Sequence, residues 1–154
     1  HVDEVFVKIA GETCYLWRAI DHEGEILEAY VTKSRDKAAA LKFLRKAMKR
    51  YGSPKAIVTD GLTSYGAAMK EIGNQQKRET KRYLNNQIES SHLSFRRRER
   101  AMQRFRQRRR LQKFAAIQSS VYNHVNLDRH LTPRAAFKTN RDAALQNWQA
   151  LIAA

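Results

Sequence analysis

The chain has 154 residues, 42 % of them hydrophobic, and is long enough to bury a core as one domain over residues 1–154. Its one cysteine, Cys14, excludes an internal disulfide and is compatible with a reducing cytoplasm, and no apolar run reaches the roughly 20 residues of a membrane span. Thirty Lys and Arg against fifteen Asp and Glu give a net charge of +15, which predicts a polyanionic partner, with nucleic acid ahead of an anionic membrane surface.

The N-terminal part of the sequence predicts three strands. Residues 2–9 alternate in polarity and place Asp3 on the same face as three aliphatic side chains, which is typical of a half-buried strand. Residues 14–21 and 26–32 are further apolar runs, and short turns that contain glycine separate the three segments. The pattern predicts an antiparallel meander.

A helix, a strand and a second helix are expected next. Apolar residues recur at helical spacing over residues 40–51, with Ser34 as the expected cap and Gly52 as the end. Residues 56–59 form a short apolar run that predicts a buried strand in parallel pairing. A short helix then begins at Thr63 or Ser64 and ends near Gly73.

The remainder of the chain is predicted to be helical after a polar loop over residues 73–81. Apolar residues recur from Leu84 to Val125, as one helix or two. The pair Thr132-Pro133 predicts the start of a short helix, and a last helix over residues 141–152 is expected to bury Leu145, Trp148 and Leu151. The order βββαβα followed by helices predicts an α/β fold of the RNase H-like type, with a mixed five-stranded sheet flanked by helices.

Three acidic residues fall where a site is expected. Asp3 lies on the apolar face of the first strand, where a carboxylate is costly to bury unless it is paired or metal-bound. Asp60 follows a buried strand, at the end where ligands of open α/β sheets gather. Glu89 lies on a helix face with four other polar side chains: Asn85, Asn86, His92 and Arg96.

Each acid taken alone is more often a turn, cap or surface residue, and only their joint placement favours a site. Asp21 also ends a strand and competes with Asp3, although the His22-Glu23-Gly24 that follows it favours a turn. Mg²⁺ prefers oxygen ligands, and two such ions about 4 Å apart can activate a nucleophile and neutralise a leaving oxygen on DNA. We therefore predict that Asp3, Asp60 and Glu89 hold two Mg²⁺ ions, with Mn²⁺ as a substitute.

Four segments of the chain read HVDEVFVK at residues 1–8, YLWRAID at 15–21, VTDG with SYG within 58–66, and LNNQIESSH at 84–92. They resemble the catalytic domain of bacterial insertion-sequence transposases, and look closest to the small insertion sequences of the IS-six type. The segment TPRAAF at residues 132–137 is similar to a motif late in integrase-type cores. The resemblance covers nearly the whole chain, in order.

The resemblance implies that Asp3, Asp60 and Glu89 are a DDE triad and that Arg96 is the basic partner seven residues after the glutamate. Only 28 residues separate Asp60 from Glu89, a shorter spacing than is usual in this group, and the loop over residues 73–81 is expected to absorb the difference. Whole members also carry an N-terminal helix-turn-helix for end recognition, which we expect this chain to lack.

A basic segment follows the third acid. Between Arg96 and Lys113 there are ten Lys or Arg and one acid, Glu99, and like charges at helical spacing repel unless a polyanion lies against them. Four side chains are expected to anchor the segment to the core: Phe95, Met102, Phe105 and Leu111. Trp17 and Trp148 are expected in the core or against a partner. The expected DNA-binding residues are Asn86, His92, Arg96, Arg97, Arg98, Arg104, Arg108 and Arg109.

The sequence thus predicts the catalytic domain of a DDE transposase, a two-metal polynucleotidyl transferase that cleaves DNA at transposon ends and joins it to target DNA. Two alternatives remain: an RNase H-like nuclease without strand transfer, and an inactive DNA-binding remnant. The expected partners are double-stranded DNA and at least one further copy of the chain, because two ends must be brought together. We expect it in the bacterial cytoplasm, at the nucleoid, and not at a membrane.

Overall fold

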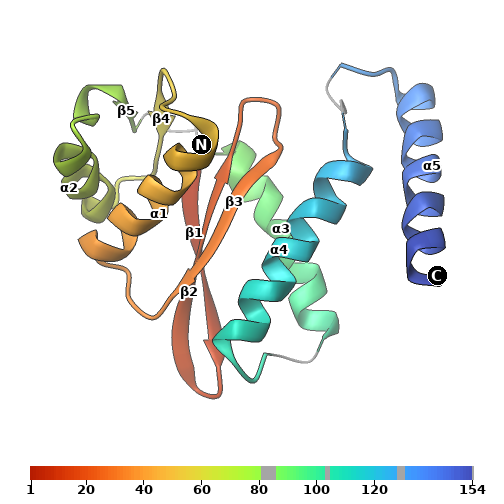
Figure 1. Cartoon of the computed structure of the whole chain (residues 1–154), viewed down its shortest axis with the longest axis horizontal. Helices are drawn as coiled ribbons and strands as arrows, with labels where there is room; N and C mark the ends of the chain where they lie inside the picture. Colours follow the sequence, from red (N-terminus) through yellow and green to blue (C-terminus); the bar gives the residue numbers. More distant parts are fainter. Residues whose placement is uncertain (81–85, 103–104, 128–130, 154) are drawn as a thin grey trace.

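The computed structural model describes residues 1–80, 86–102, 105–127 and 131–153 (Figure 1). Three strands come first, followed by helices that alternate with two short strands, and then by helices alone. The elements are β1 (Val2–Ile9), β2 (Glu12–Ile20), β3 (Ile26–Thr32), α1 (Lys37–Tyr51), β4 (Ile57–Val58), α2 (Thr63–Ile72), the 3₁₀ turn η1 (Gln75–Lys77), β5 (Arg78–Glu79), α3 (Asn86–Ala101), α4 (Arg108–Val125) and α5 (Arg134–Ala153).

The first three strands form the antiparallel meander that the sequence predicts, in the order β1-β2-β3. Ala10 and Gly11 join β1 to β2 with φ angles of 50° and 86°, and this pair of positive φ values matches the twist of a tight hairpin. The register places Asp3 opposite Arg18, so both side chains lie on the same face of the sheet.

The continuous five-stranded sheet expected from the sequence is not what the described residues form. β4 pairs in parallel with β5, and one bridge between Val2 and Thr59 connects this pair to β1. β4 is short because the chain turns directly after it, where the carboxylate of Asp60 accepts the N–H of Leu62 at 3.0 Å. Residues 73–81 were predicted to be a loop, yet they hold η1 and β5, whose polar residues show no alternation.

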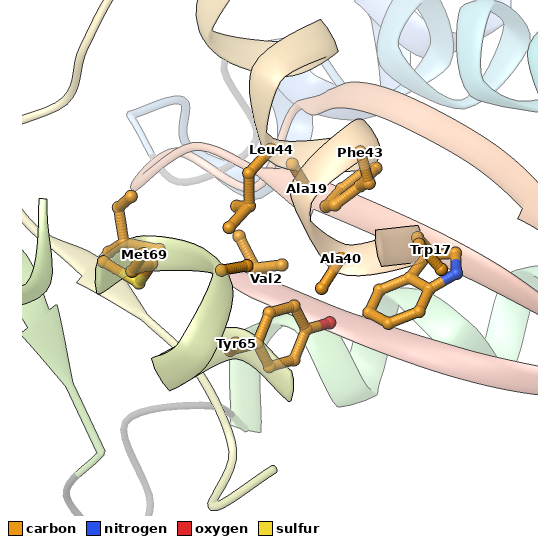
Figure 2. Packing of buried hydrophobic residues seen from close by; sticks show 11 residues of the cluster. Val2, Trp17, Ala19, Ala40, Phe43, Leu44, Tyr65 and Met69 are labelled. Atoms are coloured by element: carbon orange, nitrogen blue, oxygen red, sulfur yellow. The ribbon is translucent and has the colours of Figure 1, made fainter. Parts of the chain in front are cut away.

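Helices α1 and α2 cover one face of the meander, and α3 and α4 cover the other (Figure 1). Figure 2 shows the core on the first face, where the ring of Trp17 meets Tyr65 edge-on at 5.5 Å between centroids. Trp17 is fully buried, as expected, and its indole N–H donates to Thr32. Burial of each large side chain here stabilises the fold by about 1.5–3 kcal/mol.

Side-chain amides attach α4 to the outer edge of β3. Gln112 accepts the N–H of Val31 at 2.8 Å and donates to the carbonyl of Ala29 at 2.7 Å. Eleven residues further along α4, Asn123 accepts from and donates to the backbone of Ile26, at 2.8 and 3.0 Å. The two amides therefore take the hydrogen-bonding places of a fourth strand.

The helix boundaries confirm some predictions and correct others. Gly52 and Gly73 end α1 and α2 as expected, but Asp36, rather than Ser34, caps α1 by accepting the N–H of Ala39. The long apolar series is two helices, α3 and α4. The two C-terminal helices expected from the sequence are one helix, which begins at Arg134, directly after Thr132-Pro133, and continues to Ala153.

Helix α5 lies outermost, against α4 (Figure 1). Its predicted burial is wrong for Leu145 and Leu151, which are 42 % and 70 % exposed, and the buried residue on this helix is Ala144. The ring of Trp148 packs edge-on against His124 of α4. Over the described residues, no helix is both long and apolar enough to cross a membrane.

Candidate active site

A group of carboxylates lies where β1 meets β4. Oxygen atoms of Asp3, Glu4 and Asp60 all fall within 4.8 Å of one another. Asp3 and Glu4 are consecutive in β1 and leave opposite faces of the strand, while the bridge from Val2 to Thr59 brings Asp60 alongside them. Two of the three acids predicted from the sequence, Asp3 and Asp60, therefore lie together.

Burial and charge make Asp3 the most perturbed of these acids. Burial raises its pKa to about 7, the charges of Glu4, Asp60 and Glu89 act in the same direction, and the backbone N–H of Glu4 opposes them. Glu89, on α3, is near enough for its charge to act on Asp3. Glu89 is exposed and lies outside the close set of three oxygens. A carboxylate with so high a pKa lacks a compensating cation within the described residues.

His92 does not supply that cation. Its Nδ1 lies 3.8 Å from a carboxylate oxygen of Asp3, but burial together with the charges of Arg18 and Arg96 lowers its pKa to about 3. The imidazole is therefore neutral at physiological pH. His92 was predicted to contact DNA, and the structure places its largely buried side chain beside the carboxylates instead of on the outer surface.

Glu4 is the residue that sequence reasoning missed. Its side chain is 2 % exposed, it accepts the hydroxyl hydrogen of Tyr65 at 2.8 Å, and it pairs closely with Arg35. Burial raises the pKa of Glu4, whereas Tyr65 and Arg35 lower it. Arg35 also lies 3.5 Å from Asp60. Strand alternation grouped Glu4 with exposed Phe6, although the apolar Val2 on the same parity could have indicated an inward position.

Arg78 of β5 fixes the segment that carries Asp60. Its guanidinium donates to the hydroxyl of Thr59 at 2.9 Å and to the carbonyls of Asp60 and Leu62, each at 3.0 Å. A side chain at Gly66 would collide with this guanidinium, since an added Cβ would meet it at 2.6 Å. Arg78 thereby fixes the turn that carries Asp60 by hydrogen bonds to three of its residues.

A second buried arginine ties α3 to the sheet. Arg18 is 1 % exposed and donates to the carbonyl of Ser91 at 3.0 Å, and burial lowers its pKa to about 10. Because Ser91 is two residues from Glu89, this hydrogen bond fixes the part of α3 that carries Glu89 relative to the sheet. Sequence alternation gives no sign of a fully buried arginine, so this contact was also missed.

The basic segment forms a cationic surface beside the carboxylates, composed of the C-terminal half of α3 and the first turns of α4. Phe95, Phe105 and Leu111 are buried beneath it as predicted, while Met102 is 50 % exposed, so its predicted burial is wrong.

Asn86 is exposed at the start of α3, and Arg96 is partly buried. The exposed cations are Arg97, Arg98, Arg100, Arg106, Arg108, Arg109, Arg110 and Lys113. Two predicted residues, Asn85 and Arg104, lie outside the described residues.

The donor set fits a divalent cation. Carboxylate oxygens are the ligands that Mg²⁺ and Mn²⁺ prefer, and the high pKa of Asp3, caused first by burial and then by the neighbouring acids, shows that its carboxylate would gain from a cation beside it. The carboxylates that lie close enough together to share such an ion are Asp3, Glu4 and Asp60, of which Glu4 already pairs with Arg35 and Tyr65. Asp21 is not a rival, because its carboxylate accepts the N–H groups of Glu23 and Glu25 and closes a turn.

These features define a mixed α/β domain with a cluster of carboxylates where β1 meets β4 and a cationic helical surface beside that cluster. A family model described as a DDE domain, of the IS240 transposase type, matches residues 1–141. The chain therefore belongs to this DDE domain family, which confirms the resemblance read from its sequence.

Curated relatives agree with this assignment. The transposase for the insertion sequence-like element IS431mec of Staphylococcus aureus is 38 % identical over 96 residues, which are 59 % of this chain and 43 % of the relative. The transposase for the element IS257 in transposon Tn4003 of Staphylococcus aureus has the same values. An uncharacterized Yersinia pseudotuberculosis protein, pYV0051, is 33 % identical over 79 residues, 49 % of this chain and 74 % of that protein. The chain thus spans less than half the length of the staphylococcal transposases.

A solved structure shares the fold. It is a chain of the simian T-cell lymphotropic virus intasome, solved by cryoEM in complex with the PP2A regulatory subunit B56 gamma. The TM-score is 0.60 at 17 % identity, over 86 % of this chain and 54 % of that chain. The likeness concerns the backbone arrangement alone.

Proposed function

We propose that this chain is the catalytic core of a transposase, which cleaves DNA at the ends of a mobile element and joins the freed 3′ end to target DNA. The observation that carries the proposal is the meeting of Asp3 and Asp60 where β1 joins β4, and the charge of Glu89, on α3, also acts on Asp3. Family membership and the adjoining cationic surface support it. We also propose that the bridge between Val2 and Thr59 is the junction of an RNase H-like sheet.

In this proposal Asp3, Asp60 and Glu89 hold two Mg²⁺ ions, for which Mn²⁺ can substitute. The ions would supply an activated nucleophile and a neutralised leaving oxygen. The chain itself positions these ligands: Arg78 fixes the Asp60 turn, Arg18 fixes α3, and neutral His92 packs beside Asp3 without competing as a cation.

The cationic surface is proposed to hold double-stranded DNA by its phosphates, and two copies or more are proposed to act on paired ends. Phosphate contacts orient a duplex without reading its sequence, which suits a catalytic core that must accept varied target DNA. The fold shared with an intasome chain supports action within an assembly.

A strand-transfer assay tests the proposal. The purified protein is incubated with labelled duplex DNA carrying the element end, with Mg²⁺ or with EDTA, beside Asp60→Asn and a matched control, Asp142→Asn on the outer helix α5. Joined product that requires Mg²⁺ and is lost only in Asp60→Asn supports a transposase. Cleavage without joining would identify a nuclease, and binding without either would identify a DNA-binding remnant.

A further inference from the structure

An exposed aromatic side chain stands on β1, two residues after Glu4 and on the same face of the strand. Phe6 is 60 % exposed, although its neighbours Val5 and Val7 in the same strand are buried. It lines a groove of about 780 Å³ together with residues from β1, α3 and the segment before α4. The chemically important residues of this groove are Phe6, Lys8, Arg96, Glu99, Phe105 and Arg106.

Arg96 holds this ring in place from the other side of β1. One guanidinium nitrogen donates to the backbone carbonyl of Phe6 at 2.6 Å, and another pairs with Glu99 at 2.7 Å. The same guanidinium lies 5.0 Å from the centre of the Phe6 ring, within cation–π distance. The ring is therefore backed by a fixed cation, and leaving it in water sacrifices the free energy that burial would provide.

The charges of the groove indicate an anionic ligand with a flat face. Three cations, Lys8, Arg96 and Arg106, line it against one acid, Glu99, which is already paired with Arg96. An aromatic ring among cations is the arrangement that holds single-stranded nucleic acid, because bases stack on the ring while phosphates meet the cations. Within a duplex the faces of the bases are covered by their neighbours, so only an unpaired base can use such a ring.

We propose that this groove binds an unpaired base of the DNA strand being processed, stacked on Phe6, with Lys8 and Arg106 on the adjoining phosphates. Phe6 is three residues from Asp3, roughly 10 Å along the strand, and it leaves β1 on the same face as Glu4 and on the opposite face from Asp3. A base stacked there would belong to a nucleotide near the phosphate at the carboxylates. The inference rests on the proposed function and adds to it a requirement for local opening of the duplex.

The test compares two DNAs of the same sequence, a blunt duplex and one with a short unpaired tail that carries 2-aminopurine, by fluorescence anisotropy and by quenching of that base. We expect Phe6→Ala to weaken binding of the tailed DNA about tenfold, which corresponds to about 1.4 kcal/mol. Binding of the blunt duplex should change less than about twofold, because phosphate contacts supply its affinity.

Two further substitutions at Phe6 separate stacking from folding. Phe6→Tyr keeps a ring and should bind both DNAs as the parent does, whereas Phe6→Leu keeps an apolar side chain without a ring and should behave as Phe6→Ala. The matched control is Tyr51→Ala at the end of α1, since Tyr51 is 46 % exposed and also has an arginine, Arg50, at 5.3 Å from its ring. It should leave both affinities unchanged.

Equal weakening of both DNAs in Phe6→Ala, or no weakening of either, overturns the inference, as does a normal Phe6→Leu. The strand-transfer assay, run on the same preparations, separates this inference from the proposed function. If the parent cleaves and joins DNA but the Phe6 variants bind the tailed and the blunt DNA with the parent's relative affinity, the proposed function holds and the proposed base-binding groove is refuted. If the parent does not cleave DNA but prefers the tailed DNA, and this preference requires the Phe6 ring, the base-binding groove holds and the proposed function is refuted.

Discussion

Asp3 should make the stability of the metal-free domain depend on pH. Its pKa is about 7 in the folded chain against 3.8 as the ordinary value, so the folded state keeps a proton that the unfolded chain releases between these limits. Because the folded state binds more protons in that window, the free energy of unfolding falls as the pH rises. From about pH 5 to about pH 8 the loss due to Asp3 is about 2–3 kcal/mol.

Urea unfolding of the metal-free parent and of Asp3→Asn, at about pH 5 and about pH 8, measures this loss. The amide cannot ionise, so the variant should gain about 2–3 kcal/mol relative to the parent between the two pH values. Contributions of titrating groups remote from Asp3 cancel in this comparison. Asp142→Asn is the control, because Asp142 lies on α5 with 65 % of its side chain exposed, and it should follow the parent.

Mn²⁺ extends the same experiment, since a carboxylate must lose its proton before it binds a metal. The ion should restore stability to the parent at about pH 8, give less at about pH 5, and do little for Asp3→Asn. The reasoning is refuted if parent and Asp3→Asn lose stability in parallel as the pH rises. It is refuted equally if Mn²⁺ stabilises both proteins to the same extent.

Three further changes test other parts of the site. Asp60→Asn should abolish cleavage and joining while circular dichroism and DNA binding stay near parental values, because the amide oxygen can still accept the turn hydrogen bond. Arg78→Met should lower the free energy of unfolding, measured in urea, by about 2–3 kcal/mol. It should also lower the affinity for Mn²⁺, measured by calorimetry, by at least about tenfold. The control Arg45→Met, on the exposed side of α1, should leave both values near those of the parent. Reversing charge at Arg108 and Arg109 should flatten the slope of log K against log salt by up to about two units, in a titration where the parent slope is roughly −5; an unchanged slope would place the DNA on another face.

Local patterns were enough to predict the meander and the ends of α1 and α2 at glycine, because alternation and helix terminators are readable along the chain. That Asp3 and Asp60 would share a site was favoured by the joint placement of the acids and implied by the family resemblance. The family assignment was likewise available from short segments around these residues.

The contacts that complete the site could not be read in this way. Glu4 and Arg18 sit on strands whose alternation indicates only a face, and what each meets there depends on Arg35, Tyr65 and Ser91, which arrive from distant segments. β5 was missed because its pairing relies on backbone hydrogen bonds between polar residues, which leave no periodic signal.

The two side-chain amides that join α4 to β3 attach the helix to the strand at two separate points. Gln112 and Asn123 are three helical turns apart, roughly 16 Å, and they meet β3 at points separated by roughly 10–16 Å of strand. A helix held at two such points cannot slide lengthwise or rotate without breaking one attachment. Because Arg108, Arg109 and Arg110 begin that same helix, the two attachments to β3 also fix where these cations stand relative to the sheet that carries Asp3.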